Sequence, residues 1–142
     1  MNERLLVLSV ILLVALLIAL WAATRPRVLT ARLRRGRAPG VTPSGRPLVL
    51  AFTSADCAAC HAAQRPALAE LAARLGDRVE IHEVDVLTDW EIARTFGIFS
   101  VPSTVILDAE ARVVAFNIGF APAERLFVQL PPTRNDGAAT RS

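Results

Sequence analysis

Residues 47–75 decide the fold, and they read PLVLAFTSADCAACHAAQRPALAELAARL. The first seven residues are a short apolar run rich in β-forming side chains, which predicts a buried strand over 47–53. The later residues predict a helix from about 58 to 75 that Gly76 ends. The apolar side chains of that helix recur at helical spacing and form one buried face: Leu68, Leu71, Ala72 and Leu75.

The rest of the domain continues the alternation of strands and helices. A second strand is expected over 79–86, and a capping box from Thr88 to Glu91 predicts a helix to about Phe96. Strands at 104–107 and 113–118 form a hairpin, and Pro122 begins a last helix that ends near Leu130. The order β-α-β-α-β-β-α predicts an α/β fold, in which parallel strands joined by a right-handed crossover precede the antiparallel hairpin.

The N-terminus carries a separate apolar segment. Residues 5–23 read LLVLSVILLVALLIALWAA without a charge, and a helix of about 20 such residues crosses a bilayer. A secretory signal peptide is the alternative, but Glu3 offsets Arg4 in its basic region. Leu20, Trp21 and Thr24 also fit poorly with a cleavage site. We therefore expect residues 1–23 to be an uncleaved, single-pass anchor with its helix at 5–23.

Arginines follow the anchor and set its expected orientation. Six lie between Arg25 and Arg37, against Arg4 alone before the anchor, and no acidic residue intervenes before Asp56. Basic flanks are retained in the cytoplasm, so we expect the soluble domain on the cytoplasmic face, with the extracytoplasmic side as the alternative. Beside a membrane helix, these arginines fit anionic lipid headgroups better than nucleic acid.

Two further segments flank the domain. Residues 24–46 contain repeated proline and glycine, which predicts an extended, mobile linker. Residues 131–142 begin with two prolines and are polar, which predicts a disordered tail. The domain itself is therefore expected over residues 47–130.

Cys57 and Cys60 are the chain's two cysteines, and they lie where the first strand gives way to the first helix. At a helix N-terminus, unpaired N–H groups and the helix dipole stabilise an anion, so the pKa of the Cys57 thiol should fall. Cys60, one turn later, can close a disulfide with it. In a βαβ context this spacing indicates a redox pair, with Cys57 the nucleophile and Cys60 the resolving thiol.

Three other interpretations of the pair remain open. The cysteines can serve as small buried apolar residues. Zinc would need four ligands, and His61 and His82 are the two histidines that could join the pair. The string Cys57-Ala58-Ala59-Cys60-His61 also matches the attachment motif of c-type haem, with His82 the remaining histidine for a second axial ligand.

The domain resembles the thioredoxin family over about residues 47–130. Three features carry the resemblance: the strand–C-x-x-C–helix segment, residues 99–104 (FSVPST), and Gly119 after the fourth strand. The resemblance implies a thioredoxin-like fold and a cis-proline loop at Val101–Pro102 that shapes a groove for protein substrates. It also implies thiol–disulfide exchange with protein partners and a recycling redox partner, without a bound cofactor.

Several residues depart from the family pattern. Asp56 stands where a tryptophan is common, Ala51 replaces a buried aspartate, and Pro66 lies one residue later than usual. Asp56 disfavours a thiolate by like-charge repulsion, so a binding or scaffold module with weak redox activity is the main alternative. His61, four residues after Cys57, is either a proton partner for the cysteines or an exposed helix residue.

Overall fold

The computed structural model describes residues 2–132, and over residues 24–35 it describes the backbone. Its centre is a four-stranded sheet in the order β2-β1-β3-β4. The strands are β1 (Leu48–Thr53), β2 (Glu80–Asp85), β3 (Ser103–Leu107) and β4 (Val113–Ile118). β1 pairs parallel to β2, whereas the β1–β3 and β3–β4 pairs are antiparallel. The predicted α/β order, with its crossover and its hairpin, is confirmed.

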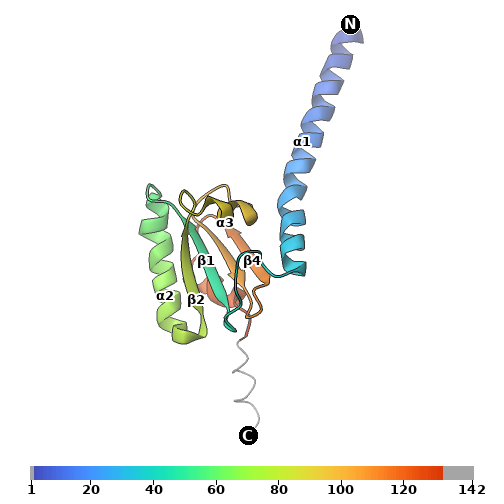
Figure 1. Cartoon of the computed structure of the whole chain (residues 1–142). Coiled ribbons are helices and arrows are strands. Elements are labelled where there is room, and N and C mark those ends of the chain that lie inside the picture. Colours follow the sequence, from blue (N-terminus) through green and yellow to red (C-terminus); the bar gives the residue numbers. More distant parts are fainter. Residues whose placement is uncertain (1, 133–142) are drawn as a thin grey trace.

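Helices cover both faces of the sheet (Figure 1). α2 (Arg65–Leu75) and α4 (Ala123–Gln129) pack on one face, and α3 (Trp90–Thr95) packs on the other. A short 3₁₀ turn, Gly76–Arg78, follows α2.

The central strand β1 is buried on both faces, which explains its uninterrupted apolar sequence. Successive side chains of a strand point to opposite sides. Leu48, Leu50 and Phe52 therefore join the core beneath α3, and Val49 and Ala51 join the core beneath α2 and α4. Phe52 meets Phe96 there, with ring centroids 5.9 Å apart. This packing holds the C-terminal end of β1, where the cysteine pair follows, at a defined place on the sheet.

The first half of the predicted helix at 58–75 differs from a regular α-helix. Residues Cys60–Gln64 form a π-helical turn, in which the N–H of Arg65 bonds the carbonyl of Cys60, five residues earlier. A π-turn holds one residue more than an α-turn. Pro66, which the sequence places one residue later than the family pattern, follows directly.

The predicted capping box at Thr88 does not form. α3 begins at Trp90, and Asp89 is its N-cap without a side-chain cap hydrogen bond. The Thr88 hydroxyl instead lies 3.4 Å from the Asp89 carboxylate. The prediction that Thr88 caps this helix was therefore wrong.

The N-terminal helix α1 runs from Asn2 to Arg35 and is therefore longer than the helix predicted over 5–23. Within the described residues, one helix is long and apolar enough to cross a membrane, over Asn2–Ala23, and a signal sequence would pass the same test. The prediction of an extended linker from residue 24 was wrong over 24–35. Pro26 removes one helical hydrogen bond, but the alanine, leucine and arginine residues around it are strong helix formers.

The remainder of the predicted linker is partly docked on the domain. The N–H of Ala38 donates to the carbonyl of Ala111 at 2.7 Å, and Arg37 forms a β-bridge with Arg112. Ala38 is itself buried in the core beneath α3. At the other end Pro131 and Pro132 are irregular, and the predicted disordered tail beyond them lies outside the described residues.

Candidate redox site

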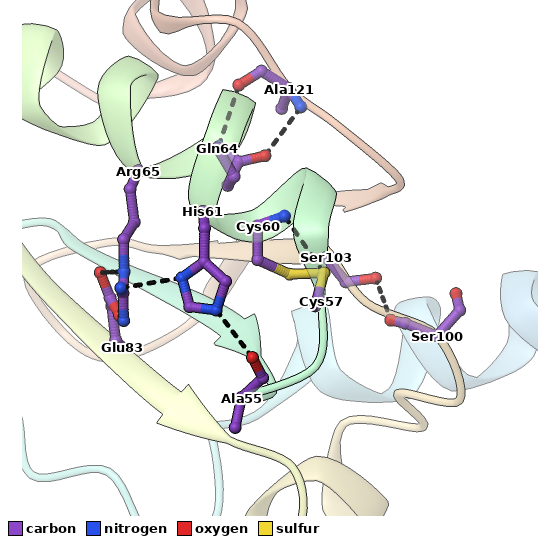
Figure 2. The surroundings of a disulfide bond; sticks show 10 residues. All are labelled: Ala55, Cys57, Cys60, His61, Gln64, Arg65, Glu83, Ser100, Ser103 and Ala121. Atoms are coloured by element: carbon purple, nitrogen blue, oxygen red, sulfur yellow. Dashed lines mark hydrogen bonds and ion pairs between the residues drawn. A yellow bond between two sulfur atoms is a disulfide. The ribbon is translucent and has the colours of Figure 1, made fainter.

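The two cysteines form a disulfide at the C-terminal end of β1 (Figure 2). A turn positions them: the N–H of Cys57 donates to the carbonyl of Ser54 at 3.1 Å. The N–H of Cys60 lies 3.1 Å from the sulfur of Cys57. Cys57 is half-buried, whereas Cys60 is 2% exposed. An incoming group therefore reaches the sulfur of Cys57 more readily than that of Cys60.

The loop before β3 lies beside this pair, and Figure 2 includes Ser100 and Ser103 in the disulfide's surroundings. The Val101–Pro102 peptide bond is cis. The carbonyl of Pro102 accepts the N–H of Gly119 at 2.9 Å, and Gly119 has a φ of 86°, a conformation that favours glycine. Val101 helps to line a hollow of about 350 Å³ between this loop and α3.

His61 is engaged away from the sulfurs. Figure 2 shows its ring between Ala55 and Arg65. Nε2 lies 3.0 Å from the carbonyl of Ala55, and the Arg65 guanidinium lies 2.9 Å from Nδ1. A carbonyl accepts and a guanidinium donates, so in this arrangement Nε2 donates to Ala55 and Nδ1 accepts from Arg65. His61 thus links the loop before Cys57 to the helix after it.

Arg65 extends this link to the sheet. Its guanidinium makes a two-pronged contact with the carboxylate of Glu83 on β2, at 2.9–3.2 Å. Hydrogen bonding to Glu83, and then Coulomb attraction to it, raise the pKa of Arg65 above its usual value. Both side chains are exposed, so this series of contacts from Glu83 through Arg65 and His61 adds little to the stability of the fold. Its main effect is to position the loop at Ala55, before Cys57.

Gln64 is a site residue that the sequence analysis missed. Its side chain is 3% exposed and lies in the π-turn that begins at Cys60. Its amide donates to the carbonyl of Ala121 and accepts the N–H of the same residue, both at 3.0 Å. Gln64 precedes Leu68 by four residues and Leu71 by seven, so helical periodicity is the signal that could have placed it on the buried face.

The two other departures from the family pattern have clear structural settings. Ala51 is 2% exposed in the core beneath α2, so this position offers no carboxylate to the pair. Asp56 is exposed directly before Cys57. The site therefore carries its acidic group at the surface.

A mixed sheet with helices on both faces, a C-x-x-C disulfide after β1 and a cis-proline before β3 define a thioredoxin-like protein. The family model of the thioredoxin-like domain matches residues 40–131, so the chain belongs to this family. The matched region begins before the predicted boundary at residue 47, in agreement with the docked segment around Ala38.

Individual relatives agree with this assignment. A thioredoxin of Bacillus subtilis is 36% identical over 61 residues, which span 43% of this chain and 58% of that protein, less than two thirds of its length. A solved thioredoxin-2, described as a component of the malaria parasite protein secretion machinery, is 26% identical with a TM-score of 0.57. That match covers 63% of this chain and 85% of the other. A DsbF homologue from Corynebacterium diphtheriae, at 19% identity, shares the fold with a TM-score of 0.53 over 61% and 71% of the two chains.

Proposed function

We propose that this protein is a membrane-anchored thiol–disulfide oxidoreductase that acts on protein partners through Cys57 and Cys60. The observation that carries the proposal is the asymmetry of the pair. Cys57 is accessible at the start of the helix, and Cys60 is buried one turn inside it. Thiol–disulfide exchange needs one thiol that attacks the partner and a second thiol that resolves the mixed-disulfide intermediate.

The reaction in the reducing direction follows from this arrangement. The Cys57 thiolate attacks one sulfur of a partner disulfide, and the other partner sulfur leaves as a thiolate that takes up a proton. Cys60 then loses its proton to water and attacks the Cys57 sulfur, which releases the second partner thiol and closes the Cys57–Cys60 disulfide. Two electrons have passed to the partner, and a dithiol reductant must restore the pair.

The loop at Val101 and Pro102 is the proposed substrate groove. Pro102 has no N–H, and its carbonyl is already bonded to Gly119. The backbone groups of Val101 are therefore the ones that an extended peptide beside Cys57 would pair with. His61 is better assigned to holding the loop before Cys57 than to proton transfer, because both ring nitrogens are engaged elsewhere.

A scaffold module with weak redox activity is the second candidate, which Ala51 and Asp56 favour. A c-type haem fits the geometry less well. His61, the ligand that the motif would supply, is held by Ala55 and Arg65.

Alkylation of the reduced chain distinguishes the oxidoreductase from the scaffold. We expect iodoacetamide to modify Cys57 before Cys60. The midpoint, which is the pH at which the modification rate of Cys57 is half its maximum, should lie below about 8.5, the pKa of a free thiol. The hydrogen bond from the Cys60 N–H favours the thiolate. Asp56→Asn should lower the midpoint further, because it removes a like charge. Faster modification of Cys60, or a midpoint at or above that of free cysteine, would favour the scaffold.

We also propose that Asn2–Ala23 is an uncleaved anchor and that the domain lies on the cytoplasmic face. The length and composition of the segment support the anchor. The arginine-rich sequence after it supports the orientation. Thiols are generally kept reduced on this side, which suits a resting dithiol that acts as a reductant.

A reporter fused after Ser142 tests this orientation in bacterial cells. We expect green fluorescence from a fluorescent-protein fusion and background activity from an alkaline phosphatase fusion, because the phosphatase requires export. Replacing the six arginines between Arg25 and Arg37 with glutamine should raise phosphatase activity, since it removes the retained charge. High phosphatase activity with the native sequence would place the domain outside the cytoplasm.

A further inference from the structure

The attachment point of α1 lies at the end of the sheet opposite the disulfide. β3 begins beside Phe52, near the disulfide, and ends beside Leu48, so the β3–β4 turn is at the far end of the sheet. Ala111 and Arg112 belong to this turn, and Ala38 and Arg37 bind to them. The chain therefore leaves α1 and joins the domain at the end remote from Cys57.

From this point α1 returns toward the disulfide end. It contacts β4, and Figure 1 shows it rising beside the sheet and continuing past the end where α3 lies. Residues 24–35 of the helix span about 18 Å, at about 1.5 Å per residue. β4 spans roughly 20 Å, at about 3.4 Å per residue. The two lengths match, so the apolar segment begins at about the level of the disulfide end of the sheet.

The same end of the sheet carries exposed apolar side chains. The C-terminal ends of β1, β2 and β4 and the start of β3 meet there. The segments next to these ends carry what we call the apolar rim: Leu87, Trp90, Phe99, Ile118 and Phe120. Phe99 is 88% exposed and Ile118 is 66% exposed. Large exposed apolar side chains in one region mark an interaction surface.

We propose that the apolar rim contacts the bilayer surface from which α1 emerges, so that Cys57 works on cysteines held at that surface. The proposal rests on the membrane anchoring proposed above and adds the substrate class: disulfides in membrane proteins, close to the bilayer. Aromatic side chains such as Trp90 and Phe99 suit the headgroup level. Asp56, Asp89 and Glu91 are exposed at this end, so apolar insertion, and not attraction to anionic lipid, drives the contact.

The two tryptophans allow a direct test, because Trp21 lies in the apolar segment and Trp90 in the rim. The full chain is placed in phosphatidylcholine vesicles whose acyl chains carry bromine, which quenches nearby indole. In Trp21→Phe, which leaves Trp90, we expect fluorescence to fall by about half, since interfacial side chains reach about 5–10 Å into the headgroup boundary. In Trp90→Phe, which leaves Trp21, bromine deep in the chains should quench strongly.

Two surface substitutions sharpen the result in the Trp21→Phe background. Phe99→Ser should reduce the quenching of Trp90, whereas Val128→Ser should not, since Val128 is 73% exposed on α4, outside the rim. Quenching of Trp21 without quenching of Trp90 would overturn this inference but would leave the proposed anchoring intact. The apolar rim would then be available to bind soluble partners. Unquenched Trp21 would contradict the anchoring itself, and this inference with it.

Discussion

Replacing Cys60 with serine should convert a transient mixed disulfide into a stable covalent complex. In the native chain Cys60 is buried directly behind Cys57 and can attack it. Without that thiol, the disulfide between Cys57 and the partner persists until an external thiol reduces it. We expect the Cys60→Ser chain from cells to migrate with its partners on non-reducing gels, and the complexes to disappear on reduction.

Cys57→Ser is the matched control. It keeps one cysteine in the chain but removes the accessible one, and exchange with a peptide disulfide should fall by at least about a hundredfold, because a nucleophile and its partner act as a unit. Equal trapping by both variants would refute the assigned roles. Membrane proteins should dominate the partners trapped by Cys60→Ser if the rim faces the bilayer.

Gln64→Ala should give the largest loss of stability from a single polar residue near the site. The substitution leaves the N–H and carbonyl of Ala121 without a partner in the buried core, where Ala121 itself is 0% exposed. Each orphaned group costs about 1–3 kcal/mol, so for the two groups together we expect the free energy of unfolding to fall by about 2–6 kcal/mol. Urea titration of the full chain in detergent, in the Trp21→Phe background so that Trp90 is the remaining fluorophore, measures this change.

Gln64→Glu is an informative companion, because it keeps the size of the side chain. Its carboxylate can accept the N–H of Ala121 but can donate to the carbonyl only when protonated. Folding therefore favours the protonated form and raises the pKa of this glutamate, so stability should be regained at low pH and lost as the pH rises through the raised pKa. A loss below about 1 kcal/mol in Gln64→Ala would show that water satisfies Ala121.

The strands and the cysteine pair could be predicted from sequence because their signals are local. The apolar run of β1 reflects burial on both faces, and each predicted strand begins and ends within one residue of its observed bounds. The cap at Thr88 failed because the helix begins one residue later than the motif predicts, with Asp89 at the N-cap position. The prediction of an extended linker was wrong over 24–35 because most of its prolines and glycines lie at 36–45, whereas Pro26 alone interrupts a run of strong helix formers.

The surroundings of the pair were harder to predict because they depend on contacts between distant segments. Gln64 and Ala121 are 57 residues apart in the chain. The engagement of His61 depends on Arg65, which in turn is held by Glu83 on another strand. Helical periodicity can predict the face of the helix on which a side chain lies, but it cannot identify the distant residue that the side chain contacts.

The π-turn at Cys60–Gln64 also bears on how this chain can vary. Because the turn holds one residue more than an α-turn, a chain shorter by one residue could form a regular helix between the same ends. A single deletion is thus absorbed between the cysteines and Pro66, without shifting α2 or the sheet. Such a change would rotate Gln64 away from Ala121, so the register of this turn and the identity of residue 64 should change together among descendants of one ancestor.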